Sequence, residues 1–217
     1  MQTAMKNVLK SLQSLVVVLA GAPLFAVDLA LAQETPDVTI RRAVDGVTAT
    51  LSADKAILAG DRRRINLLVD EKVMPYVSIG RMTQSALGPA WARATPEQRQ
   101  ALTAEFKRLL TNTYAGAFAS YQPDTKIEYR PLRLATDDGD ATVRSLVSAG
   151  GAEPIQLDYY LEQIDGAWKV TDFGVFGVRM VETYKGQFRG AVASSGVDGL
   201  IKALEAKNIS NEARGAR

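Results

Sequence analysis

The sequence predicts an α+β fold in which helices cover a twisted antiparallel meander of four strands. Apolar residues recur at intervals of three and four upstream of about residue 122, as on one face of a helix, and tend to alternate downstream of it, as on one face of a strand. The chain has 217 residues, of which 47% are hydrophobic and 23% charged, which is ordinary for one globular domain.

The amino terminus has the pattern of a secretory signal peptide over residues 1–32. Two lysines precede an apolar run at residues 12–27, and Ala-Leu-Ala follows at residues 30–32. A membrane anchor is the alternative, but Pro23 and Asp28 interrupt a run that is already short for a bilayer. We therefore expect cleavage after residue 32 and release into the periplasm. One domain over residues 33–208 and a disordered tail over residues 209–217 would follow.

The composition excludes several classes of protein. The chain has no cysteine, which excludes a thiol-linked lipid anchor, a disulfide and a thiolate metal site. It has no histidine, which excludes a Ser-His-Asp triad and the usual zinc sites. The nearly balanced charge argues against a nucleic-acid partner. We accordingly expect no metal, no cofactor and no catalytic residue, although carboxylate, lysine or tyrosine chemistry stays open.

Helices are predicted in the first part of the mature chain. Thr35-Pro36 combines a cap residue with proline at the first helical position, and an apolar face continues to Leu51. A second helix is predicted over residues 62–74, because Pro75 forces its end. A shorter helical piece follows, as far as Gly88.

The strongest local signal is Thr-Pro-Glu-Gln at residues 95–98. A threonine cap, a proline at the first helical position and a glutamine three residues after the cap form a capping box. A long helix therefore begins here, with an apolar stripe from Leu102 to Phe118. Two further helices are predicted at the end of the domain, over residues 179–193 and 197–207.

Four strand-like runs lie between the long helix and the closing helices, at residues 126–134, 141–149, 155–164 and 167–176. Short turns rich in Asp and Gly separate them, and connections this short join antiparallel neighbours. Apolar side chains alternate with polar ones on the last two runs. The residues predicted to share the apolar face are Ile155, Leu157, Tyr159, Leu161, Trp168 and Val170. One face of the sheet is thus predicted to be buried under helices.

Two features of the residues at predicted core positions suggest a pocket between sheet and helices as an alternative to a solid core. Several tyrosines fall at predicted buried positions, and each would need a partner for its hydroxyl, which water or a ligand in a cavity would supply. Gly174 and Gly177 flank Phe176 where packing should be densest. They either leave room for a ligand or mark a bulge or strand exit.

A series of short motifs, taken in order, resembles the MlaC family, which includes auxiliary proteins of toluene tolerance. The motifs are Leu-Val-Asp-Glu-Lys-Val-Met-Pro-Tyr-Val at 68–77, Ala-Leu-Gly-Pro-Ala-Trp at 86–91, Thr-Pro-Glu-Gln-Arg at 95–99, Leu109-Leu110 with Tyr114, Gly-Ala-Trp-Lys-Val-Thr-Asp at 166–172, Gly177-Val178 and Tyr-Lys-Gly-Gln-Phe at 184–188. The resemblance covers about residues 36–207. It departs from the family at Arg179, where the family commonly has serine.

The resemblance implies a periplasmic phospholipid carrier, with acyl chains held between a twisted sheet and its helices. It would move lipid between an outer-membrane MlaA–porin complex and the inner-membrane MlaFEDB transporter, as a monomer, and so maintain outer-membrane lipid asymmetry. From the strand and helix faces we expect the pocket to be lined by Val73, Tyr76, Leu109, Tyr114, Val147, Tyr159, Val170, Phe173, Val175, Met180 and Tyr184. Arg179 is a candidate for pairing with the phosphate of a headgroup.

Other functions remain open on the sequence alone. A hopanoid or a fatty acid is an alternative cargo, since the same residue types would line the pocket. Asp172 lies mid-strand among apolar residues. It has two interpretations: a general base for isomerisation of an apolar substrate, or a structural carboxylate held by hydrogen bonds. A solid adaptor domain that docks other envelope proteins is a further alternative.

Overall fold

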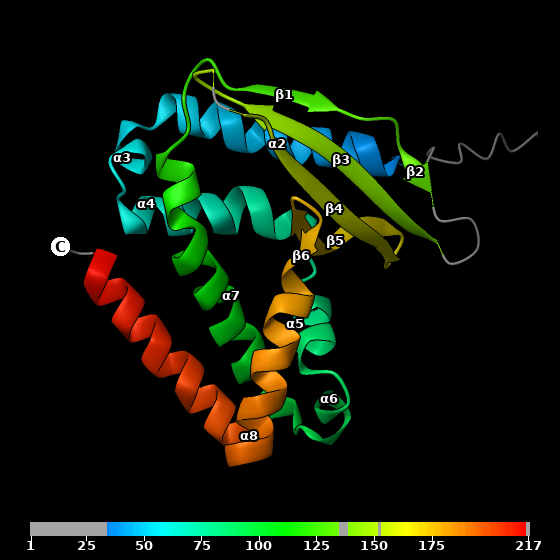
Figure 1. Cartoon of the computed structure of the whole chain (residues 1–217), viewed down its shortest axis with the longest axis vertical. Helices are drawn as coiled ribbons and strands as arrows, with labels where there is room; N and C mark the ends of the chain where they lie inside the picture. Colours follow the sequence, from blue (N-terminus) through cyan, green and yellow to red (C-terminus); the bar gives the residue numbers. More distant parts are fainter. Residues whose placement is uncertain (1–33, 135–138, 152, 216–217) are drawn as a thin grey trace, which may run out of the picture. The chain divides into compact units, whose positions relative to one another are not determined.

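The computed structural model describes residues 34–134, 139–151 and 153–215, and in this part helices precede and follow a single antiparallel sheet (Figure 1). The predicted signal peptide lies outside the described residues. No helix of the described ranges is both long enough and apolar enough to cross a bilayer.

The first helices largely follow the predicted signals. Helix α2 (Pro36–Ala53) begins with proline at its first position, although the hydroxyl of Thr35 donates to Asp37 and does not cap the helix. A short helix α3 (Lys55–Leu58) was not predicted. The predicted helix over residues 62–74 consists of α4 (Arg62–Leu68), a π-helical turn η1 (Val69–Val73) and a 3-10 turn η2 (Met74–Tyr76). The helical segment ends at the turn that contains Pro75, as expected of a residue that lacks an N–H.

The central helix is capped as predicted. Helices α5 (Ile79–Leu87) and α6 (Ala90–Arg93) lead to α7 (Pro96–Ala119). The Thr95 hydroxyl accepts from the backbone N–H of Gln98 at 3.2 Å, and the Gln98 side chain accepts from the backbone N–H of Thr95 at 3.0 Å. Both bonds of a capping box are present.

The sheet has six strands in the described residues, where four were predicted. Strands β1 (Lys126–Tyr129) and β2 (Arg133–Leu134) both pair with β3 (Asp140–Ser148), which is followed by β4 (Ile155–Ile164), β5 (Ala167–Val175) and β6 (Val178–Arg179). All pairs of strands are antiparallel. The first predicted strand is divided because Pro131 cannot donate to the ladder, and β6 is an additional hairpin arm.

The two glycines around Phe176 serve backbone geometry and packing. Phe176 and Gly177 have φ of 50° and 79°, and they connect the paired residues Val175 and Val178 as a two-residue hairpin turn. A Cβ on Gly174 would lie 3.3 Å from Cβ of Asp158 and 3.3 Å from the ring of Tyr160. These glycines therefore mark the exit of the strand and do not leave room for a ligand.

A bulge at Thr171 changes which residues of β5 share a face. Asp172 pairs with Tyr160, but Val170 pairs with Leu161, so Thr171 has no partner in the register. Because of this extra residue, Val170 and Phe173 point to the same side of the sheet although they are three positions apart.

Helix α8 (Met180–Gly215) combines the two predicted closing helices across a kink at Gly196, where φ is 71° and ψ is −176°. Figure 1 shows the two halves, orange and red, running in different directions. The second half packs on α7 through Leu200 and Leu204. Residues 209–215 belong to this helix, which corrects the expectation of a disordered tail: Glu212 pairs with Arg108 at 2.6 Å and ties the segment to α7.

Candidate functional site

One side of the sheet, here called the inner face, is almost entirely apolar. The strand registers place on it Ile127, Tyr129, Ala141, Val143, Ser145, Val147, Ile155, Leu157, Tyr159, Leu161, Gln163, Trp168, Val170, Phe173 and Val175. The predicted common face of residues 155–161 with Trp168 and Val170 is thereby confirmed. The opposite, outer face carries mainly polar and charged side chains.

Helix α2 covers only part of the inner face. Ile40 of α2 packs with Val143, Leu161 and Val170 in a buried cluster, and Figure 1 shows this helix beside β3. All four side chains are at most 2% exposed. The sheet is therefore closed at this end by ordinary core packing.

The other end of the inner face, here called the open end, is formed by Val147, Ile155, Val175 and Val178. Val147 is half-buried, and Ile155 and Val175 are exposed. Val178 is 65% exposed and lies opposite Val175 on β6. Phe176 at the tip of the hairpin is 64% exposed. Apolar groups left this exposed at one end of a buried sheet face typically mark a site where an apolar partner binds.

The eleven predicted lining residues fall into distinct surroundings. Tyr159, Val170, Phe173, Val147 and Val175 share the inner face, as the register requires. Leu109, Met180 and Tyr184 belong to, or pack against, the core between α7 and α8. Val73 and Tyr76 are half-buried in the turns after α4, and Tyr114 is exposed on α7. The structure thus joins five of the eleven on one face.

Phe173 connects the sheet to the helical core. It packs against both buried clusters, and its ring meets that of Tyr159 edge-on, with centroids 5.9 Å apart. In the helical core, the Phe106 ring contacts Tyr184 at 5.1 Å and Phe188 at 5.2 Å, both edge-on. Tyr184 is therefore part of a tightly packed aromatic group.

Burial raises the pKa of two tyrosines among the predicted lining residues. It raises the pKa of Tyr114 above its usual value. Burial is also the main reason that the pKa of Tyr184 is raised, and the neighbouring Tyr114 adds to this rise. These phenols consequently stay neutral at physiological pH.

Arg179 occupies the outer face, because it pairs in register with Gly174. Its Nε donates to the Asp172 carboxylate at 2.7 Å, and its guanidinium lies 4.2 Å from the centroid of the Tyr160 ring. The sequence suggested a role at a headgroup. The structure instead shows a side chain engaged by a carboxylate and a ring on the face opposite the apolar residues.

Both carboxylate oxygens of Asp172 accept hydrogen bonds. Besides Arg179, its carboxylate accepts from the backbone N–H of Phe173 at 2.8 Å and of Val181 at 3.0 Å, and the residue is 1% exposed. These contacts join β5 to the first turn of α8. They favour the structural interpretation of Asp172 over that of a general base, which would need a free lone pair facing a substrate.

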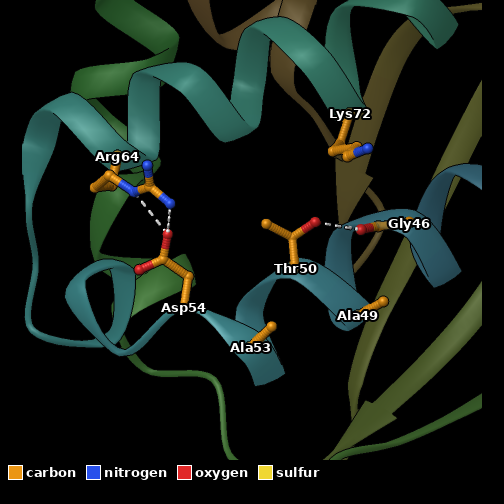
Figure 2. A pocket seen from close by; sticks show the side chains of 7 residues that line it. All are labelled: Gly46, Ala49, Thr50, Ala53, Asp54, Arg64 and Lys72. Carbon is orange, nitrogen blue, oxygen red and sulfur yellow. Dashed lines mark hydrogen bonds and ion pairs between the residues drawn. The ribbon is translucent and has the colours of Figure 1, made fainter.

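A separate pocket of about 560 Å³ opens between α2 and the segment from α4 to η1 (Figure 2). Its walls are Gly46, Ala49, Thr50, Ala53, Asp54, Arg64 and Lys72. Asp54 and Arg64 form an ion pair across it, and the Thr50 hydroxyl donates to the carbonyl of Gly46 at 2.8 Å. None of the predicted lining residues belongs to these walls, and charged groups with small side chains suit polar solvent better than acyl chains.

Two hydroxyl residues on the inner face did not appear among the predicted lining. Tyr129 and Ser145 lie opposite each other on β1 and β3. The period-2 alternation of the first strands places them on this face, although a hydroxyl is not a typical signal of a buried position. In the described ranges, no cluster of three or more acidic side chains lies close enough to hold a metal ion.

Comparison with known proteins agrees with this architecture. The MlaC protein family matches residues 41–206. The intermembrane phospholipid transport system binding protein MlaC of Haemophilus influenzae is 26% identical over 81% of this chain and 83% of that protein. Toluene tolerance protein ttg2D of Pseudomonas putida is 28% identical over 86% of this chain and 84% of that protein.

A solved structure extends the likeness to three dimensions. The phospholipid-binding protein from Ralstonia solanacearum, determined in complex with a phospholipid, is 40% identical, with a TM-score of 0.76, over 80% of this chain and 97% of that chain. With a family match that spans most of the domain and a shared fold at this identity, the chain belongs to the MlaC family.

Proposed function

We propose that this protein is a periplasmic carrier that binds the acyl chains of a phospholipid between the inner face of the sheet and its helices. The observation that carries the proposal is the inner face itself, which is mostly apolar, is buried under α2 at Val143, Leu161 and Val170, and stays exposed at the open end. The phospholipid-bound relative from Ralstonia solanacearum supports the choice of cargo.

The energetics favour a deep site over a surface groove. Two acyl chains hold roughly 30 methylenes, and at about 0.8 kcal/mol each their transfer from water is worth roughly 24 kcal/mol. Even four methylenes left in water would cost about 3 kcal/mol. A carrier must therefore enclose the tails, while the headgroup stays outside and contributes little to affinity.

Release of the lipid follows from the same physics. A membrane complex that offers an equally apolar site makes the transfer nearly isoenergetic, so docking lets the lipid pass between the two sites without exposing the acyl chains to water. We propose the outer-membrane MlaA–porin complex and the inner-membrane MlaFEDB transporter as donor and acceptor, without assigning a direction. The carrier works as a monomer after removal of the signal peptide, needs no cofactor and performs no catalysis.

The deciding experiment is organic extraction of the purified protein followed by mass spectrometry. A stoichiometric diacyl phospholipid in the extract would support the proposal. A hopanoid or free fatty acid in its place would reassign the cargo. An extract without any stoichiometric lipid would contradict the carrier function and favour a solid adaptor domain.

A further inference from the structure

Two hydroxyl oxygens on the inner face are buried without a hydrogen-bond partner: the phenol oxygen of Tyr129 and Oγ of Ser145. Ser145 is 0% exposed. Buried polar groups are paired in nearly all native structures, because an unpaired one costs about 1–3 kcal/mol. Two such hydroxyls at neighbouring positions therefore call for an explanation.

The two hydroxyls belong to one site, because Tyr129 and Ser145 are register partners on β1 and β3. A third hydroxyl adjoins them. The pKa of Tyr159 is raised by burial, and the side chain of Ser145 is close enough to oppose that rise, although no hydrogen bond of normal geometry joins them. The pKa of Tyr129 is raised mainly by burial and further by the neighbouring Tyr159 and Asp45. The three oxygens thus form a small polar island in an apolar surface.

The island lies close to the open end. Ser145 is one inner-face position inward from Val147, which corresponds to about 7 Å along the strand. On its other side, Val143 is already sealed under α2. The edge of the island is polar as well, since the guanidinium of Arg41 lies 4.0 Å from the centroid of the Tyr129 ring.

The position of these hydroxyls, just inside the open end, matches the position of the ester groups in a bound phosphoglyceride. In a lipid bound with its tails inside and its headgroup outside, the ester carbonyls lie directly below the mouth, between the phosphate and the methylenes. Ester oxygens accept hydrogen bonds and donate none, and a neutral phenol and a serine hydroxyl are both donors. Deeper in the site only methylenes would face the protein, and hydroxyls there would stay unpaired.

We propose that Tyr129 and Ser145 donate hydrogen bonds to the ester carbonyl oxygens of the bound lipid, so that the carrier selects diacyl esters over ethers. This inference rests on the proposed carrier function and adds to it the chemical class of linkage that is recognised. The phenol of Tyr159 closes the island from β4.

The test loads the purified protein from vesicles that hold equal amounts of a diester phosphatidylethanolamine and its diether analogue with the same chains, and measures both bound lipids by mass spectrometry. We expect the wild type to bind the ester about fivefold more than the ether, the factor expected of one net hydrogen bond of about 1 kcal/mol. The double variant Tyr129→Phe with Ser145→Ala should bring the ratio close to one.

Matched controls are available on the outer face, where Tyr160→Phe and Ser148→Ala remove the same groups and should leave the ratio unchanged. If the wild type binds both lipids equally, or if the double variant keeps the full preference, the ester site is wrong while the carrier function stands. If neither lipid binds, the carrier function itself fails. Equal binding of the two lipids by the wild type would refute the ester site even if a variant does not fold.

Discussion

The carboxylate of Asp172 accepts a 3.0 Å hydrogen bond from the backbone N–H of Val181, and this contact fixes the start of α8 against the sheet. The charge lies at a helix amino terminus, where backbone N–H groups and the helix dipole favour an anion. The same carboxylate also accepts from Arg179. One buried side chain thereby aligns the last strand pair with the closing helix.

Asp172→Asn is accordingly expected to destabilise the protein by about 2 kcal/mol, because charge-assisted hydrogen bonds are replaced by weaker ones. Denaturant unfolding measures the change. Glu182→Gln is the matched control, since its exposed carboxylate pairs with Lys185 at the surface and its loss should change the free energy of unfolding by less than about 0.5 kcal/mol. Equal effects of the two substitutions would contradict this account of Asp172.

Val147→Trp should reduce the amount of co-purified lipid, because a bulky ring at the open end fills space on the inner face. Leu146→Trp, the neighbour that points to the outer face, should leave the lipid content unchanged. Extraction and mass spectrometry give lipid per protein, and circular dichroism verifies the fold. Tyr159→Trp tests the same face deeper in the site. Unchanged lipid in both inner-face variants would argue against this lining.

Gly174→Ala is expected to cost about 1–2 kcal/mol of stability, because the new methyl group would meet the Tyr160 ring and Asp158 at 3.3 Å. Gly190→Ala is the opposite case. This glycine lies within α8 with no atom near its absent Cβ, so alanine should be neutral or stabilise by up to about 1 kcal/mol. Thermal unfolding of the two variants should therefore shift in opposite directions, and a harmless Gly174→Ala would show that the sheet tolerates a side chain there.

The attachment of the carboxyl-terminal half of α8 should weaken in acid. The pKa of Glu212 is lowered, chiefly by its hydrogen bond with Arg108. A carboxyl with a lowered folded-state pKa stabilises the fold above its unfolded value, close to 4.5, and this contribution disappears as the pH falls through the folded value. The effect is small, because both side chains are partly exposed and screened by solvent. Melting temperatures of wild type and Glu212→Gln should differ at pH 7 and converge near pH 3. A constant difference would indicate a role other than charge.

Much of the fold follows from local chemistry. The capping box at Thr95 and Gln98 forms whatever surrounds it, because its hydrogen bonds join residues three apart. The turn at Asp165-Gly166 requires positive φ at both residues, which these types tolerate. Such signals are short-range, so they were readable without the tertiary structure. The helix over residues 209–215 was not predicted for the converse reason, since its contacts, such as the pair between Glu212 and Arg108, join segments far apart in the chain.

By itself, the sequence determined the class of the fold, the order of its helices and strands, and the alternation that makes one face of β4 apolar, because each depends on the periodicity of neighbouring residues. Only the tertiary structure decided that a bulge at Thr171 turns Phe173 to the same side as Val170, and that Arg179 leaves that side for Asp172. It also decided that the hydroxyls of Tyr129 and Ser145 meet without partners. Strand register and side-chain pairing are settled by contacts between distant segments, and no local pattern carries that information.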